Sequence, residues 1–117
     1  MHKVYDVLII GSGLAGQSLA LRLAEDYRVC VLSKRELPMS ASNWAQGGIA
    51  AVLNNEDSIE AHIQDTLIAG AGLCDTEVTR MVVNSGSSSI DWLMQQGVNF
   101  TKDAGNDSLH LTREGGH

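Results

Sequence analysis

Apolar and polar positions in the first third of the chain follow two different periods. Residues 4–10 (VYDVLII) form a nearly continuous apolar run, which is typical of a strand buried on both faces of a parallel sheet. Residues 14–26 carry apolar side chains at helical spacing, such as Leu19 and Leu23. Residues 28–32 (RVCVL) predict a second strand. This order predicts a βαβ unit, whose crossover is right-handed.

The next segments differ from this unit. Residues 33–56 keep no period for long and contain small residues, a proline and a Gly-Gly pair, so a functional connection is expected. Residues 57–67 have helical spacing, and Asp57 with Glu60 predicts a start like a capping box. By the same spacing, His62 is expected on the solvent side of this helix.

Residues 76–96 predict a second helical stretch, broken or kinked near Gly86 and ended by Gly97. The fold class is therefore α/β, a Rossmann-like domain with a parallel sheet in a βαβ unit, followed by helices. Only two strands are recognisable, and two strands do not make a stable sheet. We therefore expect residues 1–117 to be the incomplete N-terminal part of a dinucleotide-binding domain.

Composition narrows the class of protein. The 117 residues carry 14 Asp and Glu against 8 Lys and Arg, a net charge of −6, which argues against bulk binding of nucleic acid. No apolar run approaches the roughly 20 residues of a membrane helix, and no signal peptide is recognisable. Cys30 and Cys74 have no spacing typical of zinc ligands, so no metal site is expected. They are interpreted as buried thiols of a cytoplasmic, reducing compartment.

The chemistry begins at a glycine motif between the first strand and the first helix. Gly11, Gly13 and Gly16 form GxGxxG, with Ser12, Leu14 and Ala15 between them. The first glycine allows the tight turn, the second lets a pyrophosphate approach the backbone, and the third lets helix and strand pack closely. The pyrophosphate then meets N–H groups at the positive end of the helix. In this context the motif predicts dinucleotide binding.

The identity of the dinucleotide is less clear from the residues alone. The fingerprint expects an acidic ribose ligand at the end of the second strand, where this chain has Ser33 followed by Lys34. Ser33 can bind one ribose hydroxyl, whereas Lys34 mildly favours a 2′-phosphate, so NADP remains a competitor. Residues 40–48 (SASNWAQGG) offer hydroxyls, amides and glycine backbone that suit the polar edge of a flavin. The alternative interpretation is that this segment is a surface Ω-loop without a role in cofactor binding.

Several longer motifs carry a family resemblance across essentially the whole chain. They are DVLIIGSGLAG, VLSK, SNWAQGGIAAV, DTLIAGAGLCD and HLTREGGH. Together they resemble the L-aspartate oxidases, a branch of the succinate dehydrogenase and fumarate reductase flavoprotein family. The resemblance implies an FAD-dependent enzyme that oxidises L-aspartate to iminoaspartate, with oxygen or fumarate as electron acceptor. This reaction begins the de novo synthesis of NAD through quinolinate, and quinolinate synthase is the implied protein partner.

The resemblance also assigns residues to the flavin site. Residues 12–15 match the pyrophosphate loop, and Lys34 matches a contact on the adenosine side. The segment along the ribityl chain and isoalloxazine matches Ala41, Ser42, Asn43, Trp44, Ala45, Gln46, Gly47 and Gly48. Relatives that attach FAD covalently have a histidine where this chain has Ala41. The resemblance therefore implies non-covalent FAD.

One substrate residue is implied as well. Glu114, in REGGH, matches the carboxylate expected to orient the α-ammonium of aspartate. The residues that bind the substrate carboxylates and manage the proton lie further along the chain in that family, so residues 1–117 alone are expected to show no turnover. The alternatives from other classes are an NADP-dependent reductase domain and a non-catalytic dinucleotide-binding module.

Overall fold

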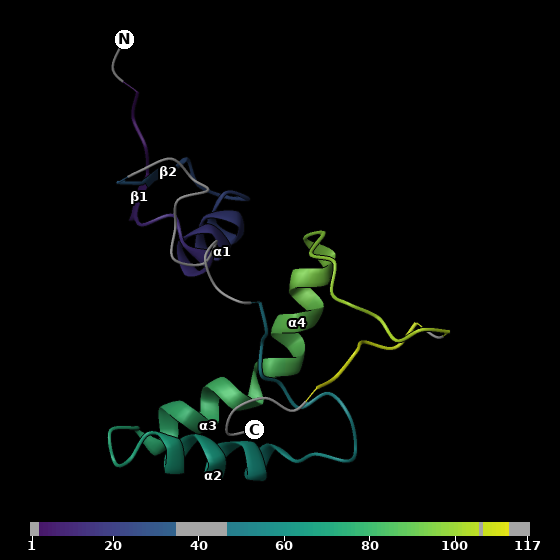
Figure 1. Cartoon of the computed structure of the whole chain (residues 1–117). Helices are drawn as coiled ribbons and strands as arrows, with labels where there is room; N and C mark the ends of the chain where they lie inside the picture. The colour runs from purple at the N-terminus through teal and green to yellow at the C-terminus, as the bar shows by residue number, and fades with distance from the viewer. Residues whose placement is uncertain (1–2, 35–46, 106, 113–117) are drawn as a thin grey trace. The chain divides into compact units, whose positions relative to one another are not determined.

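The computed structural model describes residues 3–34, 47–105 and 107–112. Contacts between residues divide the chain into two compact units, residues 1–48 and residues 49–117. Figure 1 traces the order of the elements along the chain. Among the described residues, no helix is both long enough and apolar enough to cross a membrane.

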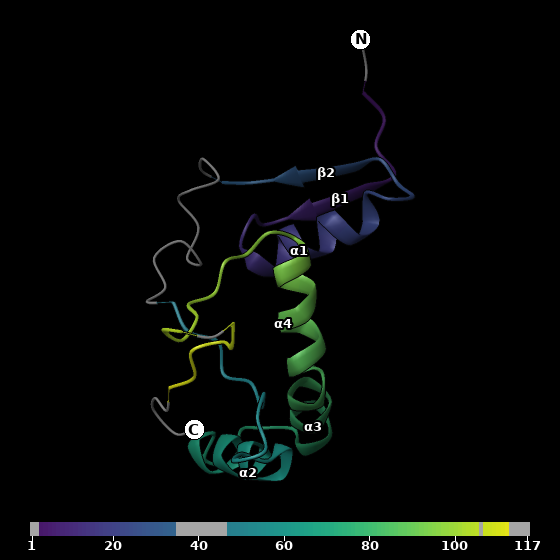
Figure 2. The ribbon, with the colours of Figure 1, turned by 90° about the vertical axis from the view of Figure 1, so that its right-hand side faces the viewer.

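The first unit is the predicted βαβ arrangement. It contains β1 (Val7–Ile10), α1 (Leu14–Leu23) and β2 (Val29–Leu32). The strands pair in parallel, in a register that runs from Val7 opposite Val29 to Ile10 opposite Leu32. Figure 2 shows the two strands side by side with α1 along one face. The order of elements is confirmed, and all three are shorter than the sequence pattern predicts.

Burial in this unit differs between the two faces of the sheet. Side chains alternate along a strand, so Ile9 points to one face and its neighbours to the other. Ile9 is 8% exposed, and its Cγ2 lies 3.5 Å from the position that a Cβ on Gly16 would occupy. Leu8 and Ile10 are 59% and 81% exposed. The sequence pattern predicts burial of this strand on both faces. Among the described residues, only the face that α1 packs against is covered, so this prediction is wrong for the other face.

An ion pair joins the starting ends of the two strands. Asp6 precedes β1 and Arg28 precedes β2. Two nitrogens of the Arg28 guanidinium, Nε and Nη2, each donate to the Asp6 carboxylate at 3.0 Å. The Arg28 backbone N–H also donates to Asp6 Oδ2, at 2.9 Å. These contacts lower the pKa of Asp6 from 3.8 to about 2, with the side-chain hydrogen bonds as the largest cause. The pair therefore ties the strands together at the end opposite the glycine turn.

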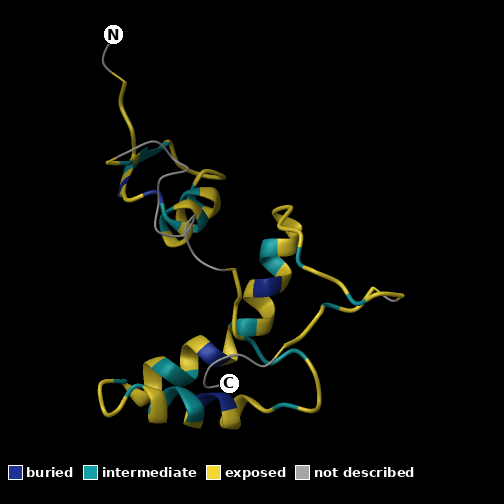
Figure 3. Ribbon diagram, viewed as in Figure 1, coloured by how far each residue is buried: buried dark blue, intermediate teal, exposed yellow. Residues whose placement is uncertain are grey.

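The second unit is built from helices. It contains α2 (Ile59–Ala69), α3 (Thr76–Asn84) and α4 (Gly86–Gln95), of which α2 packs on α3 and α3 contacts α4. The small core of this unit has one buried apolar side chain from each helix: Ile63, Val83 and Ile90. Figure 3 colours the buried parts of the three helices dark blue. Ile63 is fully buried, because it lies on the face of α2 that packs against α3.

The start of α2 corrects two predictions. Ser58, and not Asp57, is the N-cap, and its Oγ accepts from the Ala61 N–H at 3.1 Å. The expected capping box is therefore wrong, since the Glu60 carboxylate turns to another helix instead. His62 is buried, at 9% exposure, so its expected solvent-facing position is also wrong. It directly precedes Ile63, and the buried face of α2 is wide enough to include both residues.

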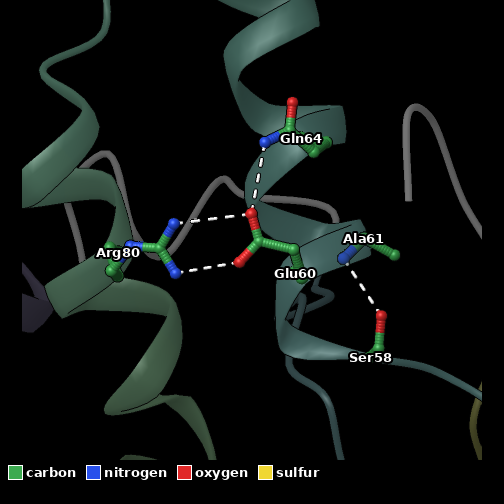
Figure 4. Close-up of polar contacts among 5 residues, drawn as sticks. All are labelled: Ser58, Glu60, Ala61, Gln64 and Arg80. Atoms are coloured by element: carbon green, nitrogen blue, oxygen red, sulfur yellow. Dashed lines mark hydrogen bonds and ion pairs between the residues drawn. The ribbon is translucent and has the colours of Figure 1, made fainter.

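Glu60 pairs with α3 across the helix interface (Figure 4). Its two carboxylate oxygens accept from Arg80 Nη1 at 2.8 Å and Nη2 at 3.4 Å, and Oε1 also accepts from Gln64 Nε2 at 3.3 Å. Arg80 is the largest influence that lowers the pKa of Glu60. This pair fixes the start of α2 against α3, so it explains why Glu60 does not cap its own helix.

The predicted break near Gly86 is confirmed, because α3 ends at Asn84 and α4 begins at Gly86. Gly97, with φ of +92°, follows α4 as predicted. Residues 98–100 form no strand. Beyond them the chain doubles back on itself, where Lys102 and Leu109 form an isolated antiparallel bridge.

Candidate dinucleotide-binding turn

The glycine turn is a direct continuation of the sheet. Gly11 follows the last residue of β1, and its N–H donates to the Leu32 carbonyl oxygen at 2.9 Å. One strand-like hydrogen bond therefore extends the pairing of β1 and β2 into the turn. Gly11 has φ of +113°, a conformation that L side chains rarely adopt. This value explains the need for glycine at the first position of the motif.

The third glycine of the motif sets the distance between helix and turn. A Cβ placed on Gly16 would collide with the Gly11 carbonyl oxygen and lie 3.1 Å from its carbon. Only a residue without a side chain allows α1 to begin this close to the end of β1. Gly13 is the N-cap of α1 and is extended, with φ of −71° and ψ of −178°. The geometry agrees with the roles predicted for Gly11 and Gly16, whereas the role of Gly13 stays a prediction.

Ser12 links the turn to the end of the second strand. Its hydroxyl donates to Ser33 Oγ at 2.8 Å, and Ser12 is 6% exposed. Ser33 directly follows β2 and is half-buried. The structure thus brings the predicted pyrophosphate loop and the predicted ribose ligand to one edge of the sheet. This contact between the two predicted regions is the strongest geometric observation at the site.

Gln17, which the sequence did not single out, contacts the glycine turn. It lies on α1, and its Nε2 donates to the Ser12 carbonyl oxygen at 2.6 Å. The available signal was a polar side chain in the first turns of a helix that follows a glycine motif. Such a side chain can reach back to a backbone group outside the helix.

The electrostatics of the turn suit an anion. Residues 11–17 contain no acidic side chain, and the first turn of α1 contains none either. Gly13 has no side chain to cap the helix, so none covers its positive end. Lys34 is exposed just beyond Ser33. The acidic residue of this unit with a strongly lowered pKa, Asp6, lies at the other end of the strands.

The remaining predicted residues divide into two groups. Leu14 and Ala15 lie in the first turn of α1 and are exposed. Gly47 and Gly48 are also exposed, and Gly47 has φ of +55°. The other predicted flavin and substrate residues lie outside the described residues: Ala41, Ser42, Asn43, Trp44, Ala45, Gln46 and Glu114. Their roles stay predictions.

Two parallel strands, a turn in which Gly11 and Gly16 need to be glycine, and a helix N-terminus together define a βαβ unit of the dinucleotide-binding class. The family described as FAD binding domain matches residues 6–117, so the chain belongs to this family. The match identifies FAD, and not NADP, as the dinucleotide of this fold.

Curated relatives point to one branch of flavoproteins. The chain is 59% identical over 114 residues to L-aspartate oxidase 1 of Ralstonia nicotianae, which covers 97% of this chain and 21% of that protein. It is 52% identical over 122 residues to L-aspartate oxidase of Pseudomonas aeruginosa, covering 99% and 23%. Against the chloroplastic enzyme of Arabidopsis thaliana the identity is 48% over 116 residues, covering 98% and 18%. The chain thus spans about a fifth of the length of these relatives.

Solved structures show the same relationship at lower identity. A variant of the E. coli quinol fumarate reductase superposes with a TM-score of 0.86 and 28% identity, covering 93% of this chain and 19% of that one. The Sdh1 complex of Mycobacterium smegmatis with UQ1 superposes with a TM-score of 0.88 and 27% identity, covering 97% and 19%. The resemblance to this flavoprotein family and the expected α/β fold are therefore confirmed.

Proposed function

We propose that this chain contributes the pyrophosphate and adenosine side of an FAD site in an enzyme that oxidises L-aspartate. The match to the FAD binding domain family carries the cofactor part, and the Ser12–Ser33 hydrogen bond of 2.8 Å beside the glycine turn supports the placement of its adenosine side. Identity of 59% to a curated L-aspartate oxidase supports the substrate. Iminoaspartate is the proposed product, with oxygen or fumarate as acceptor. The proposed place of the reaction is the first step of NAD synthesis through quinolinate, with quinolinate synthase as partner.

The residues of the turn fit a pyrophosphate. A Cβ on Gly16 would collide with the Gly11 carbonyl oxygen, and this close approach of α1 to the turn supports the proposal. N–H groups at the start of α1 would bind the phosphate oxygens, and the Ser33 hydroxyl would bind the adenosine ribose. Lys34 would contact the adenosine side of the molecule.

The flavin end of the site is proposed from the family resemblance. Residues 41–48 would lie along the ribityl chain and the isoalloxazine. Because Ala41 offers no nucleophile, attachment would be non-covalent. A bound flavin supplies an acceptor for the hydride on the substrate Cα. Glu114 would bind the α-ammonium of aspartate and thereby orient that Cα–H bond.

The first experiment is the visible absorption spectrum of the purified protein before and after acid precipitation. A flavin band that moves to the supernatant is the expected result, since the FAD is held without a covalent bond. A band that stays in the pellet would contradict the Ala41 argument. Absence of flavin binding, even after titration with FAD, would contradict the proposed cofactor role.

The substrate is tested separately. Because residues 1–117 alone are expected to show no turnover, this test uses a protein of the relatives' full length that contains this chain. In that protein, aspartate should reduce the bound flavin and bleach its band in the absence of oxygen, whereas succinate, which lacks the ammonium group, should not. Glu114→Gln should weaken aspartate binding about 10- to 100-fold, the range of a charged hydrogen bond. Equal reduction by succinate would contradict the proposed amino-acid specificity and leave the FAD assignment intact.

A further inference from the structure

Ser12 is held at two points by side chains from two different elements. Its hydroxyl donates to Ser33 Oγ after β2, and its carbonyl oxygen accepts from Gln17 Nε2 on α1. Ser12 is also nearly inaccessible, at 6% exposure. The two hydrogen bonds therefore restrict rotation of the peptide group that joins Ser12 to Gly13.

The direction of that peptide group decides which of its atoms faces a ligand. In a planar trans peptide the C=O and the following N–H point in opposite directions. Because Gln17 holds the Ser12 carbonyl, the Gly13 N–H points away from the Gln17 amide. A flipped peptide would present the carbonyl oxygen where a donor is needed, and a carbonyl facing a pyrophosphate is repulsive.

We infer that Gln17 is a positioning residue of the dinucleotide site, which keeps the Gly13 N–H directed at the pyrophosphate by holding the Ser12 carbonyl. The inference rests on the proposed FAD function. Gln17 itself does not need to touch the cofactor. Ser33 holds Ser12 from the other side through the hydroxyl group. The proposed ribose ligand, Ser33, and the proposed pyrophosphate donor, the Gly13 N–H, are thus both positioned through Ser12.

Two variants of Gln17 separate the loss of the donor from the gain of a charge. Gln17→Met keeps the length of the side chain and loses the donor, whereas Gln17→Glu replaces the donor with a carboxylate that repels the carbonyl. Titration of the full chain with FAD should show a dissociation constant raised about threefold for Gln17→Met and about tenfold for Gln17→Glu.

Gln64 provides the matched control, because its Nε2 donates to Glu60 on α2 in the other unit. Gln64→Met and Gln64→Glu should leave the dissociation constant within about twofold of the parent chain.

A second readout distinguishes positioning from general loss of stability. The phosphorus NMR resonances of bound FAD should move in both Gln17 variants and stay in place in both Gln64 variants. Ser12→Ala combined with Gln17→Met should weaken FAD binding by less than the product of the two single effects, because both act on one peptide group. Unchanged affinity and unchanged resonances in the Gln17 variants would overturn the inference while the parent chain still binds FAD. Failure of the parent chain to bind FAD would instead overturn the proposed function, and this inference with it.

Discussion

At the scale of single residues, the glycine motif is the part of the site that the sequence predicted best. Gly11 and Gly16 occupy positions where a side chain is strained or collides, as the motif requires. Ser33 could be recognised as a departure from the acidic ribose ligand, and the structure places it against Ser12. A polar side chain early in α1 was the only signal for Gln17, and the role inferred for it depends on where one carbonyl points. Backbone direction of this kind is not encoded in residue type.

Gly16→Ala is the sharpest test at this scale. The added methyl group has to displace the Gly11 carbonyl or push α1 from the strand, which should lower the free energy of unfolding by about 1–3 kcal/mol. FAD affinity should fall as well, since the turn changes shape. Chemical denaturation and FAD titration measure the two effects. Gly48→Ala is the stability control, because a Cβ there meets no atom within 4 Å, and equal stability losses in both variants would contradict the close-packing explanation.

At the scale of elements, the order strand, helix, strand and helices followed from hydrophobic spacing, whereas the ends of the elements did not. The run of residues 4–10 looks uniform, yet β1 begins only at Val7, next to Asp6, whose backbone N–H and side chain both bind Arg28. Ser58 caps α2 although Asp57 was the expected residue. The start of β1 and the N-cap of α2 both depend on tertiary partners, so the local hydrophobic spacing could not predict them. The buried position of His62 has the same origin.

The Asp6–Arg28 pair gives a pH-dependent contribution to the joining of β1 and β2. The pKa of Asp6 is lowered from 3.8 to about 2 in the folded protein, chiefly by hydrogen bonds from Arg28. Stability from this pair is therefore fully present above the unfolded value and is lost as the pH falls toward about 2. Because the pair is exposed, its contribution is small.

Asp6→Asn should remove this contribution. The variant should be slightly less stable than the parent chain at neutral pH, and the difference should vanish at the acidic end of that window. Chemical denaturation of both proteins at a series of pH values measures it. A difference that stays constant down to the lowest pH would show that Asp6 acts through something other than its charge.

At the scale of the whole molecule, the chain is acidic and yet belongs to a family that binds an anionic cofactor. Its net charge of −6 would repel FAD at long range, while the turn would attract the pyrophosphate of the proposed site through nearby backbone dipoles. The attraction by the backbone dipoles acts over a short range, so salt screens it little. The repulsion by the net charge acts over a long range, so salt screens it strongly. The composition therefore argues against bulk binding of nucleic acid without arguing against a small anion.

Raising the ionic strength should consequently not weaken FAD binding. Between about 0.01 M and about 0.15 M salt, where the Debye length falls from about 30 Å to about 8 Å, the dissociation constant should stay within about threefold or decrease. Fluorescence titration of FAD at several salt concentrations gives the slope. A steep loss of affinity with salt would instead show that exposed cations such as Lys34 dominate binding.

The hydrogen bond from Gly11 to Leu32 has a consequence for how the molecule reaches its native state. A slip of one residue between β1 and β2 would turn every side chain to the wrong face and carry Ser33 away from Ser12. Molecules with such a slip could not present the turn and the ribose ligand together. A cofactor that needs both would stabilise only correctly paired molecules, by about 2.7 kcal/mol at a concentration of about 100 times its dissociation constant. FAD would then act during folding as a selector for strand register, before any substrate is bound.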